Sequence, residues 1–214
     1  MAKIVVGLSG GVDSAVAAAL LKEQGHEVIA LFMKNWEEKD GPCPAEEDYK
    51  DVVAVCEQLD IPYYAVEFIK EYQEQVFSHF LKEYEMGYTP NPDILCNREI
   101  KFKVFWEKAK ALGGEFLATG HYAQNPQVGG EYTLHKGVDP GKDQSYFLYT
   151  LDKNILKNVL FPVGGLLKKE VREIAARWNL PNKDKKDSTG ICFIGERNFR
   201  QFLAQFIKPK KGPF

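Results

Sequence analysis

The chain has 214 residues, 44% of them hydrophobic and 27% charged, values that are ordinary for a globular domain in water. No apolar run reaches transmembrane length and the first residues enter a strand directly, so a membrane protein and a signal peptide are disfavoured and a cytoplasmic location is expected. The net charge of −2 hides an asymmetry, because residues 1–150 carry 14 Lys and Arg against 24 Asp and Glu, whereas residues 151–214 carry 14 against 6. A basic C-terminal third suggests a polyanion such as nucleic acid, although a solvated lysine-rich surface explains it equally well.

A glycine-rich turn joins the first predicted strand to the first predicted helix. The apolar run 4–8 predicts a buried strand, and residues 15–21 predict a helix that ends at Gly25. Such a turn directs free backbone N–H groups and the positive end of the helix dipole at one point, which suits phosphate. Asp13 is expected to cap the helix or to hold a metal ion on the phosphates. The alternative is an ordinary strand–turn–helix corner.

Strand and helix patterns alternate along the next hundred residues. Strands are predicted over 27–33, 62–66 and 116–119, and helices over 43–59, 72–84 and 100–112. The alternation predicts an α/β fold: a doubly wound, mostly parallel sheet with helices on both faces. Ligands of such sheets bind beyond the carboxyl ends of the strands. The glycine-rich turn, Met33 and Gly120 all fall at such ends.

The pattern changes after the fourth strand. Residues 131–136 alternate like a hairpin strand with Gly129 and Gly130 as its turn, and 152–180 look helical with an interruption near 162–165. A loop over 183–196 and a short helix over 198–207 follow. We therefore expect a nucleotide-binding domain over 1–150, a basic helical extension over 151–207 and a linker over 208–214.

Two of the four cysteines, Cys96 and Cys192, stand in polar, turn-rich surroundings. The other two, Cys43 and Cys56, are interpreted as inert, and the absence of any C-x-x-C pair disfavours a zinc cluster. Cys96 follows Asp93 by three residues in the string TPNPDILCNR, so both can share one helical turn. Cys192 lies among small polar residues, downstream of several lysines. Each could equally be a buried, unreactive thiol.

The segment 141–149 combines polar and aromatic residues. Lysine and glutamine side chains can contact phosphates and base edges, so Lys142 to Gln144 are interpreted as functional. Residues 146–149 are interpreted as a core aromatic segment instead.

Together these segments resemble the tRNA-specific 2-thiouridylases, the MnmA/TrmU family of ATP-dependent tRNA sulfurtransferases within the PP-loop ATP pyrophosphatases. The strings that carry the resemblance are GLSGGVDS, MKNW, TPNPDILCNREIKF, ATGHY, GKDQSYFL and KDSTGICFIGER. They extend from near the start of the chain to residue 197. The family continues through a central domain and a C-terminal β-barrel, so the chain is expected to correspond to the catalytic portion.

The resemblance implies a role for each matching residue. Residues expected to bind ATP are Gly7, Leu8, Ser9, Gly10, Gly11, Val12, Asp13, Ser14, Met33 and Gly120, with Asp13 as a contact for Mg²⁺. Residues expected to contact tRNA are Asn91, Pro92, Asp93, Lys142, Asp143 and Gln144. By the same resemblance Cys96 is the nucleophile, Cys192 carries sulfur as a persulfide, and Asp93 is the acid or base.

The chemistry that follows is thiolation of the wobble uridine in a tRNA anticodon loop, with a persulfide donor protein of a sulfur relay as partner. Two other readings stay open: another PP-loop ligase or amidating enzyme, and a redox-gated nucleotide-binding module. Neither would need both thiols for catalysis. The sequence alone does not name the tRNAs, the sulfur donor or the oligomeric state.

Overall fold

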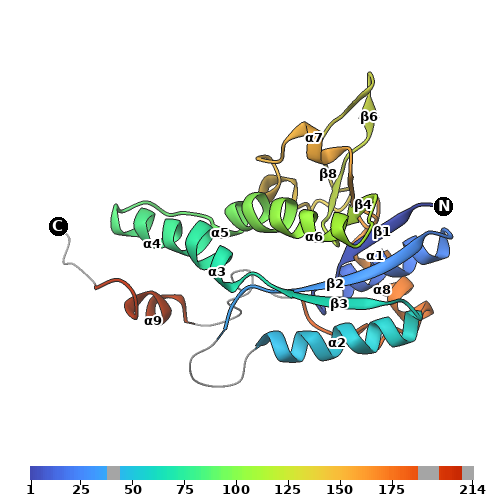
Figure 1. The fold of residues 1–214 in the computed structure, drawn as a ribbon, viewed down its shortest axis with the longest axis horizontal. Coiled ribbons are helices and arrows are strands. Elements are labelled where there is room, and N and C mark those ends of the chain that lie inside the picture. The colour runs from blue at the N-terminus through green and yellow to red at the C-terminus, as the bar shows by residue number, and fades with distance from the viewer. Residues whose placement is uncertain (38–43, 188–197, 209–214) are drawn as a thin grey trace.

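A five-stranded parallel sheet forms the centre of the computed structural model, which describes residues 1–37, 44–187 and 198–208. The strands are β1 (Lys3–Gly7), β2 (Glu27–Lys34), β3 (Tyr63–Glu67), β4 (Phe116–Ala118) and β9 (Val159–Leu160). Their order is β3-β2-β1-β4-β9, and every neighbouring pair is parallel. The chain moves outward from β1 to β3 and then returns to the other side of β1 (Figure 1). The point where the strand order reverses therefore lies between the ends of β1 and β4.

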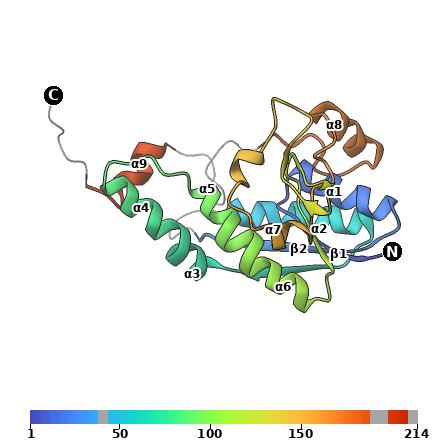
Figure 2. The ribbon, with the colours of Figure 1, turned by 90° about the horizontal axis from the view of Figure 1, so that it is seen from above.

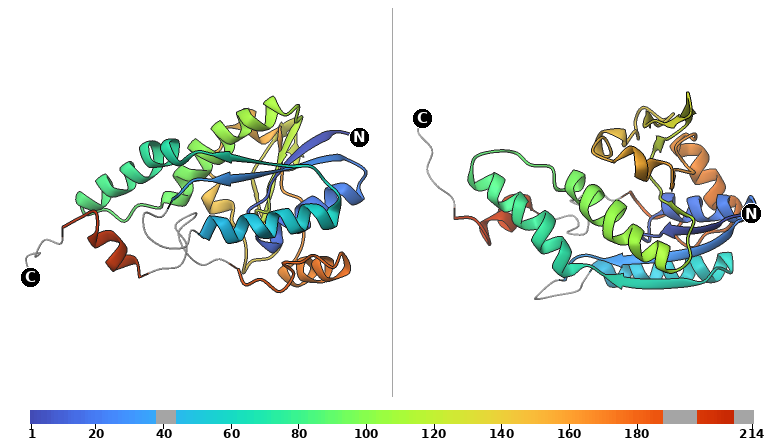
Figure 3. Two further views of the ribbon diagram at one scale, coloured as in Figure 1. Left: turned by 60° about the horizontal axis from the view of Figure 1, so that its bottom comes forward. Right: turned by 45° about the horizontal axis from the view of Figure 1, so that its top comes forward.

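Helices cover both faces of this sheet, which gives a doubly wound α/β fold as the sequence predicts. One face packs against α1 (Val12–Glu23), α2 (Pro44–Leu59) and α8 (Lys168–Arg177). The other packs against the helical segments within 69–85 and 92–111 (Figures 2 and 3). Alternate side chains of β1 and β2 enter the two cores, so these central strands are apolar on both sides.

Two long helices on the second face contain π-helical segments. The first runs through α3 (Ile69–Tyr72), the π segment η1 (Gln73–Phe77) and α4 (Ser78–Glu85). The second runs through α5 (Pro92–Leu95), the π segment η2 (Cys96–Val104) and α6 (Phe105–Ala111). π segments are uncommon and often occur at functional sites. The second helix begins at Pro92, not near residue 100 as expected, because Asn91 caps it and Pro92 fits its first turn.

The remaining elements are short. Two-residue strands form the antiparallel pairs β5 (Ala123–Gln124) with β8 (His135–Lys136), and β6 (Gln127–Val128) with β7 (Glu131–Tyr132). The other small elements are η3 (Ser145–Phe147), α7 (Lys153–Leu156) and α9 (Phe199–Ala204). The turn at Gly129 and Gly130 is confirmed, but residues 131–136 divide between two hairpins.

Strand β9 corrects the expectation that 152–180 is helical apart from one interruption. It has only two residues, too few to produce an alternation that sequence reasoning can detect, and it forms an edge of the sheet beside β4. In the described part of the chain, no helix combines the length and apolar character that crossing a bilayer would need.

Candidate functional site

The glycine-rich turn between β1 and α1 presents backbone N–H groups and hydroxyls at one helix end. Helix α1 begins after Gly11, and no side chain caps it. The Ser14 hydroxyl donates to the Gly11 carbonyl at 3.0 Å and accepts from the Ser9 amide at 3.2 Å. The turn is thus held from inside, while the first amides of α1 keep their capacity for an anionic ligand.

Two glycines let neighbouring backbone approach this turn closely. Gly10 has φ of +79°, and a Cβ there would lie 2.7 Å from the Asp48 carbonyl oxygen. A Cβ on Gly120, just beyond β4, would lie 2.6 Å from the backbone nitrogen of Ser14. The ends of β1 and β4 therefore meet at the point where the strand order reverses, which is where ligands of open α/β sheets bind.

Asp13 does not cap the helix, so that part of the sequence expectation is wrong. Its Oδ1 accepts hydrogen bonds from the Tyr122 hydroxyl at 2.8 Å and from Lys168 Nζ at 2.7 Å. Burial raises the pKa of Tyr122, and the nearby Asp13 carboxylate raises it further, so the hydroxyl stays protonated and donates. Asp13 thereby ties α1 to β4 and to the start of α8.

The loop 182–187 holds the outer side of the turn. The buried Asn182 donates through Nδ2 to the Gly10 carbonyl at 2.9 Å. Lys185 Nζ lies 2.7 Å from Asp48 and 2.5 Å from Asp51, both on α2. Basic residues of the C-terminal third thus pair with acidic residues of the N-terminal part, so some of the charge asymmetry reflects pairing within the molecule.

Asp187 is surrounded by three cations. Its carboxylate lies 2.5 Å from Lys142 Nζ, 2.7 Å from Lys168 Nζ and 3.0 Å from Arg172 Nη2. Burial raises the pKa of this carboxyl, but the hydrogen bonds and charges of Lys142 and Lys168 outweigh burial and lower it from its usual 3.8 to about 2. Lys168 therefore bridges Asp187 and Asp13.

An acid titration should reveal this ion cluster. A carboxyl whose pKa is lower in the folded state stabilises the fold above its unfolded pKa and loses that effect as the pH falls through the folded value. We expect Asp187→Asn to lower the free energy of unfolding by about 1 kcal/mol at pH 7, since the pairs are partly exposed. Urea unfolding of both proteins should show this difference shrinking between pH 4 and pH 2. A difference that stays constant over that range would contradict the lowered pKa.

A partly buried polar chain connects Thr119, at the end of β4, to the helix that carries Cys96. Thr119 Oγ1 lies 2.8 Å from His121 Nδ1, and His121 Nε2 lies 3.4 Å from Lys101 Nζ. Lys101 Nζ donates to Asn97 Oδ1 at 2.9 Å. Burial and the charge of Lys101 lower the pKa of His121 well below its usual 6.5, so the neutral ring can accept from the lysine. Cys96 is buried beside Asn97 on this helix.

The segments expected to contact tRNA lie around the same helix. Asn91 Oδ1 accepts from the Asp93 amide at 3.0 Å, so Asn91 is the cap of the helix. Asn97 Nδ2 donates to the Phe147 carbonyl at 3.3 Å, which joins the helix to the loop after β8. The structure thus brings the strings around Asp93 and around Phe147 together.

Within the loop after β8 the polar side chains hold the backbone. Asp143 accepts from the amides of Gly137 and Ser145, at 2.9 and 3.2 Å, and Gln144 Oε1 accepts from the Tyr122 amide at 3.0 Å. Burial raises the pKa of Asp143, but these hydrogen bonds lower it overall. The interpretation of 146–149 as a core segment is wrong for two residues, because Tyr146 and Tyr149 are 57% and 69% exposed.

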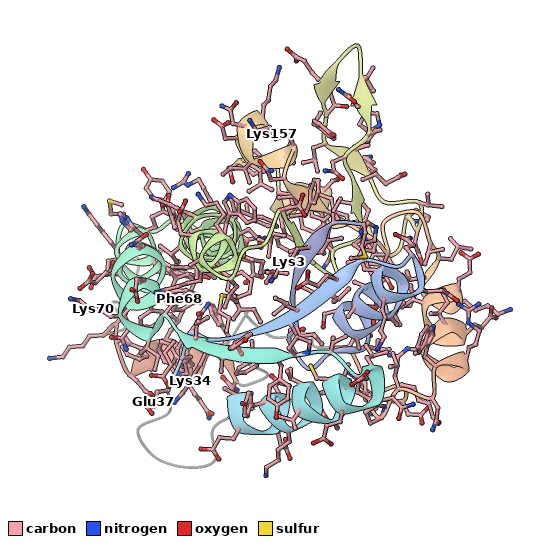
Figure 4. All side chains as sticks on the ribbon, turned by 45° about the vertical axis from the view of Figure 1, so that its right-hand side comes forward. Lys3, Lys34, Glu37, Phe68, Lys70 and Lys157 are labelled. Atoms are coloured by element: carbon pink, nitrogen blue, oxygen red, sulfur yellow. The ribbon has the colours of Figure 1, made fainter. Side chains whose placement is uncertain are left out.

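The end of β2 supplies a further side of the site. Met33 is buried in the core on the Cys96 side of the sheet. Lys34 lies 3.1 Å from Glu37 and accepts through its carbonyl from the Phe68 amide, and Figure 4 places these three residues together. Asn35 is fully buried, and neither polar atom of its side chain has a hydrogen-bond partner within the described residues. Sequence reasoning did not single out Asn35.

The other cysteines differ in what can be said of them. Cys56 is buried in the core between α2 and the sheet, and burial, with a smaller effect of Glu57, raises its pKa to about 12. It is inert at neutral pH, as the sequence indicates. Cys43 and Cys192 lie outside the described residues, which resume at Pro44 after the first gap and at Asn198 after the second.

A family model described as "tRNA methyl transferase HUP domain" matches residues 2–196. The chain belongs to this family. The tRNA-specific 2-thiouridylase MnmA of Protochlamydia amoebophila is 61% identical over 214 residues, which are 99% of this chain and 57% of that protein. The chain therefore spans little more than half the length of such curated relatives.

Solved structures with a similar fold are more distant from this chain in sequence. The U34-tRNA thiolase NcsA of Methanococcus maripaludis aligns with a TM-score of 0.56 and 20% identity, over 95% of this chain and 63% of that chain. A 4-thiouridine synthetase in complex with RNA and bound ATP aligns with a TM-score of 0.54 and 17% identity, over 95% and 50% of the two chains. At these identities the likeness establishes the fold alone.

In this HUP domain the residues that sequence reasoning missed come from distant segments. Lys168, Arg172 and Asn182 touch the turn or Asp187, and none of these three lies in a recognisable motif. Tyr122, which touches Asp13, lies in the string ATGHY but was given no role. The one available signal was the basic character of residues 151–214, which does not indicate which cation meets which carboxylate.

Proposed function

We propose that the protein is an ATP-dependent tRNA sulfurtransferase. It adenylates the C2 oxygen of the wobble uridine and replaces that oxygen with sulfur to give 2-thiouridine. The observation that carries the proposal is the junction of two sites: Gly120 lies against the first turn of α1, and His121 beside it connects through Lys101 to the helix of Cys96. Relatives named tRNA-specific 2-thiouridylase, at 61% identity, support the same assignment.

The turn after β1 binds the phosphates of ATP in this proposal. The amides at the start of α1, including that of Ser14, and the Ser9 hydroxyl donate to phosphate oxygens, and Met33 and Gly120 contact the nucleoside. Backbone donors held in place before the reaction stabilise the charge that develops on the α-phosphate at no further cost in reorganisation.

Mg²⁺ fits the residues present only as an ion held mainly by the phosphates. Among the described residues no group of three or more His, Cys, Asp and Glu side chains could hold a metal. Asp13 engages Tyr122 and Lys168 through Oδ1, so Oδ2 remains as a single carboxylate contact, a number typical of Mg²⁺ bound to nucleotides. When bound, the ion would supply positive charge against the triphosphate.

The tRNA enters on the side of Cys96. Asn91 to Asp93 and Lys142 to Gln144 would place the target base, which must leave the anticodon stack to reach the nucleotide. The exposed Tyr146 and Tyr149 add aromatic faces on which unpaired bases can stack.

The sulfur step conserves atoms and electrons. Uridine O2 attacks the α-phosphorus, pyrophosphate departs, and C2 then carries AMP as its leaving group. The terminal sulfur of a Cys192 persulfide attacks C2, the Cys96 thiolate attacks the inner sulfur, and AMP departs. Alternatively, Cys96 first releases hydrosulfide, which attacks C2. Both routes leave a Cys96–Cys192 disulfide that an external reductant must reopen.

The order of the segments supports this pairing of thiols. Asp187 pairs with Lys168 beside the nucleotide turn, and Cys192 follows Asp187 by only five residues in the sequence, so the proposal places Cys192 on this side of the site. A persulfide donor protein of a sulfur relay and a cytoplasmic location complete the proposal, together with the division of the chain into 1–150 and 151–207.

A tRNA thiolation assay tests the function directly. We expect pyrophosphate release and 2-thiouridine formation in equal amounts when the purified protein receives ATP, Mg²⁺ and a tRNA with uridine at the wobble position. A small-molecule persulfide serves as the sulfur donor, and a thiol reopens the Cys96–Cys192 disulfide. The same tRNA with cytidine at that position is the matched control and should give neither product. Pyrophosphate release that ignores the wobble base, or incorporation of ammonia or an amino acid instead of sulfur, would sink the proposal.

A further inference from the structure

The carboxylate of Asp187 occupies a small basic site to which no step above gives a role in binding ATP. Three side chains from separate segments converge on it: Lys142 from the loop after β8, and Lys168 and Arg172 from α8. These side chains are 38%, 15% and 32% exposed, so the site opens to water but is partly shielded. Among the described residues, the carboxylates of Asp187, Asp13 and Asp139 face these cations. Lys168 Nζ pairs with Asp187 and Asp13, and the Lys168 amide donates to Asp139, which also lies near Lys142.

This basic site adjoins the phosphate-binding turn. Lys168 Nζ lies 2.7 Å from Asp13 in the first turn of α1 and 2.7 Å from Asp187. Behind the turn, Asn182 is 3% exposed and bonded to the Gly10 carbonyl, while its Oδ1 has no hydrogen-bond partner among the described residues. An anion that extends from the start of α1 toward α8 would therefore meet Lys168 first.

We propose that Lys168 and Arg172, together with Lys142 from the loop that the proposed function assigns to the tRNA, form the site for the pyrophosphate part of ATP. Asp187 occupies this site as an internal competitor when no polyphosphate is bound. The inference deepens the proposed function and rests on it for the identity of the nucleotide. Lysine and arginine are the side chains that best recognise phosphate oxygens, and a carboxylate resembles such an anion in charge and geometry. Pyrophosphate carries more charge than the carboxylate that it displaces.

Helix packing alone does not account for the cluster. Helices α1 and α8, which meet near the turn through Asp13 and Lys168, are also joined at their far ends, where Arg177 of α8 lies 3.1 Å from Glu23 of α1. That contact is a simple pair, with the two side chains 59% and 48% exposed. At the end beside the turn, three cations converge on one carboxylate instead, and a polyphosphate has enough anionic oxygens to engage all three.

Calorimetric titration of inorganic pyrophosphate tests the competitor. We expect Asp187→Asn to tighten pyrophosphate binding about tenfold, since it removes a negative charge that competes at contact distance in partly screened surroundings. ATP should tighten in parallel, and AMP should bind as before. Glu23→Gln, which neutralises the carboxylate at the far end of the same helix pair, should change none of these affinities. A carboxylate that merely supports the fold predicts the opposite, because losing it would weaken binding or leave it unchanged.

A second variant keeps the test decisive if Asp187→Asn does not fold. Arg172→Gln should weaken pyrophosphate binding about fivefold, because pyrophosphate gains more from this cation than the Asp187 carboxylate does. Arg177→Gln is its control and should leave pyrophosphate binding unchanged. Unchanged pyrophosphate affinity in either site variant overturns the inference. Failure of the wild-type protein to bind both ATP and AMP would instead overturn the proposed function, so the two failures are distinguishable.

Discussion

Replacing Cys96 with alanine should abolish 2-thiouridine formation while pyrophosphate release from ATP continues. In the proposed function, adenylation uses the turn after β1 and the first amides of α1. Cys96 lies on another helix, on the other side of the partly buried pair His121 and Lys101. The nucleotide contacts therefore survive the substitution. Sulfur transfer needs a thiolate to open the persulfide, and alanine has none. We expect the thiolation rate to fall by a factor of about 10³ or more, as for loss of a nucleophile.

The chain offers a matched control for this substitution. Cys56→Ala removes an equally buried thiol from the core on the opposite face of the sheet. It should cost only the stability of a small cavity, about 1 kcal/mol, and leave thiolation unchanged. Cys192→Ala should behave like Cys96→Ala. Mass spectrometry of digested tRNA and a coupled pyrophosphate assay measure both products. Normal thiolation in either variant would exclude the two-thiol route, and loss of pyrophosphate release would indicate that the nucleotide site had been disturbed.

The sheet could be predicted from local pattern because its central strands are buried on both faces. Continuous apolar runs at β1 and β2, each followed by turn signals, mark such strands. The long helix over 92–111 was predicted only in its second half, because two prolines in the preceding string conceal its start. Strand β9 was invisible, since two residues gain their conformation from pairing with β4 and not from their own sequence.

The site divides in the same way. The glycine-rich turn and Gly120 could be found because short-range spacing encodes them. The partners of Asp13 could not, since Lys168 and Tyr122 lie 155 and 109 residues away and meet it only through the fold. The case of Asn182, which supports Gly10 from 172 residues away, is the same. Local pattern therefore locates the glycine-rich turn, whereas the charges that surround it can be assigned only from the tertiary structure.

Substituting Gly120 with alanine should disrupt the nucleotide site by steric contact alone. The added Cβ would lie 2.6 Å from the Ser14 nitrogen, 2.8 Å from the Asp13 carbonyl carbon and 2.9 Å from the Ser14 Cα. These are backbone atoms in the first turn of α1, so no side chain can swing aside. The φ angle of Gly120 is outside the positive range, hence alanine suffers no intrinsic backbone strain there.

The first turn of α1 must therefore shift, and its amides move away from the phosphates. We expect the free energy of unfolding to fall by about 2 kcal/mol, as for overpacking, and ATP affinity to fall at least tenfold, about 1.4 kcal/mol. Gly165→Ala is the control, because no heavy atom lies within 4 Å of its added Cβ, and we expect ATP to bind as in wild type. Urea unfolding and ATP titration give the two numbers. If Gly120→Ala binds ATP with wild-type affinity, the nucleotide does not lie where β1 and β4 meet, because no ligand seated on those amides could tolerate their displacement.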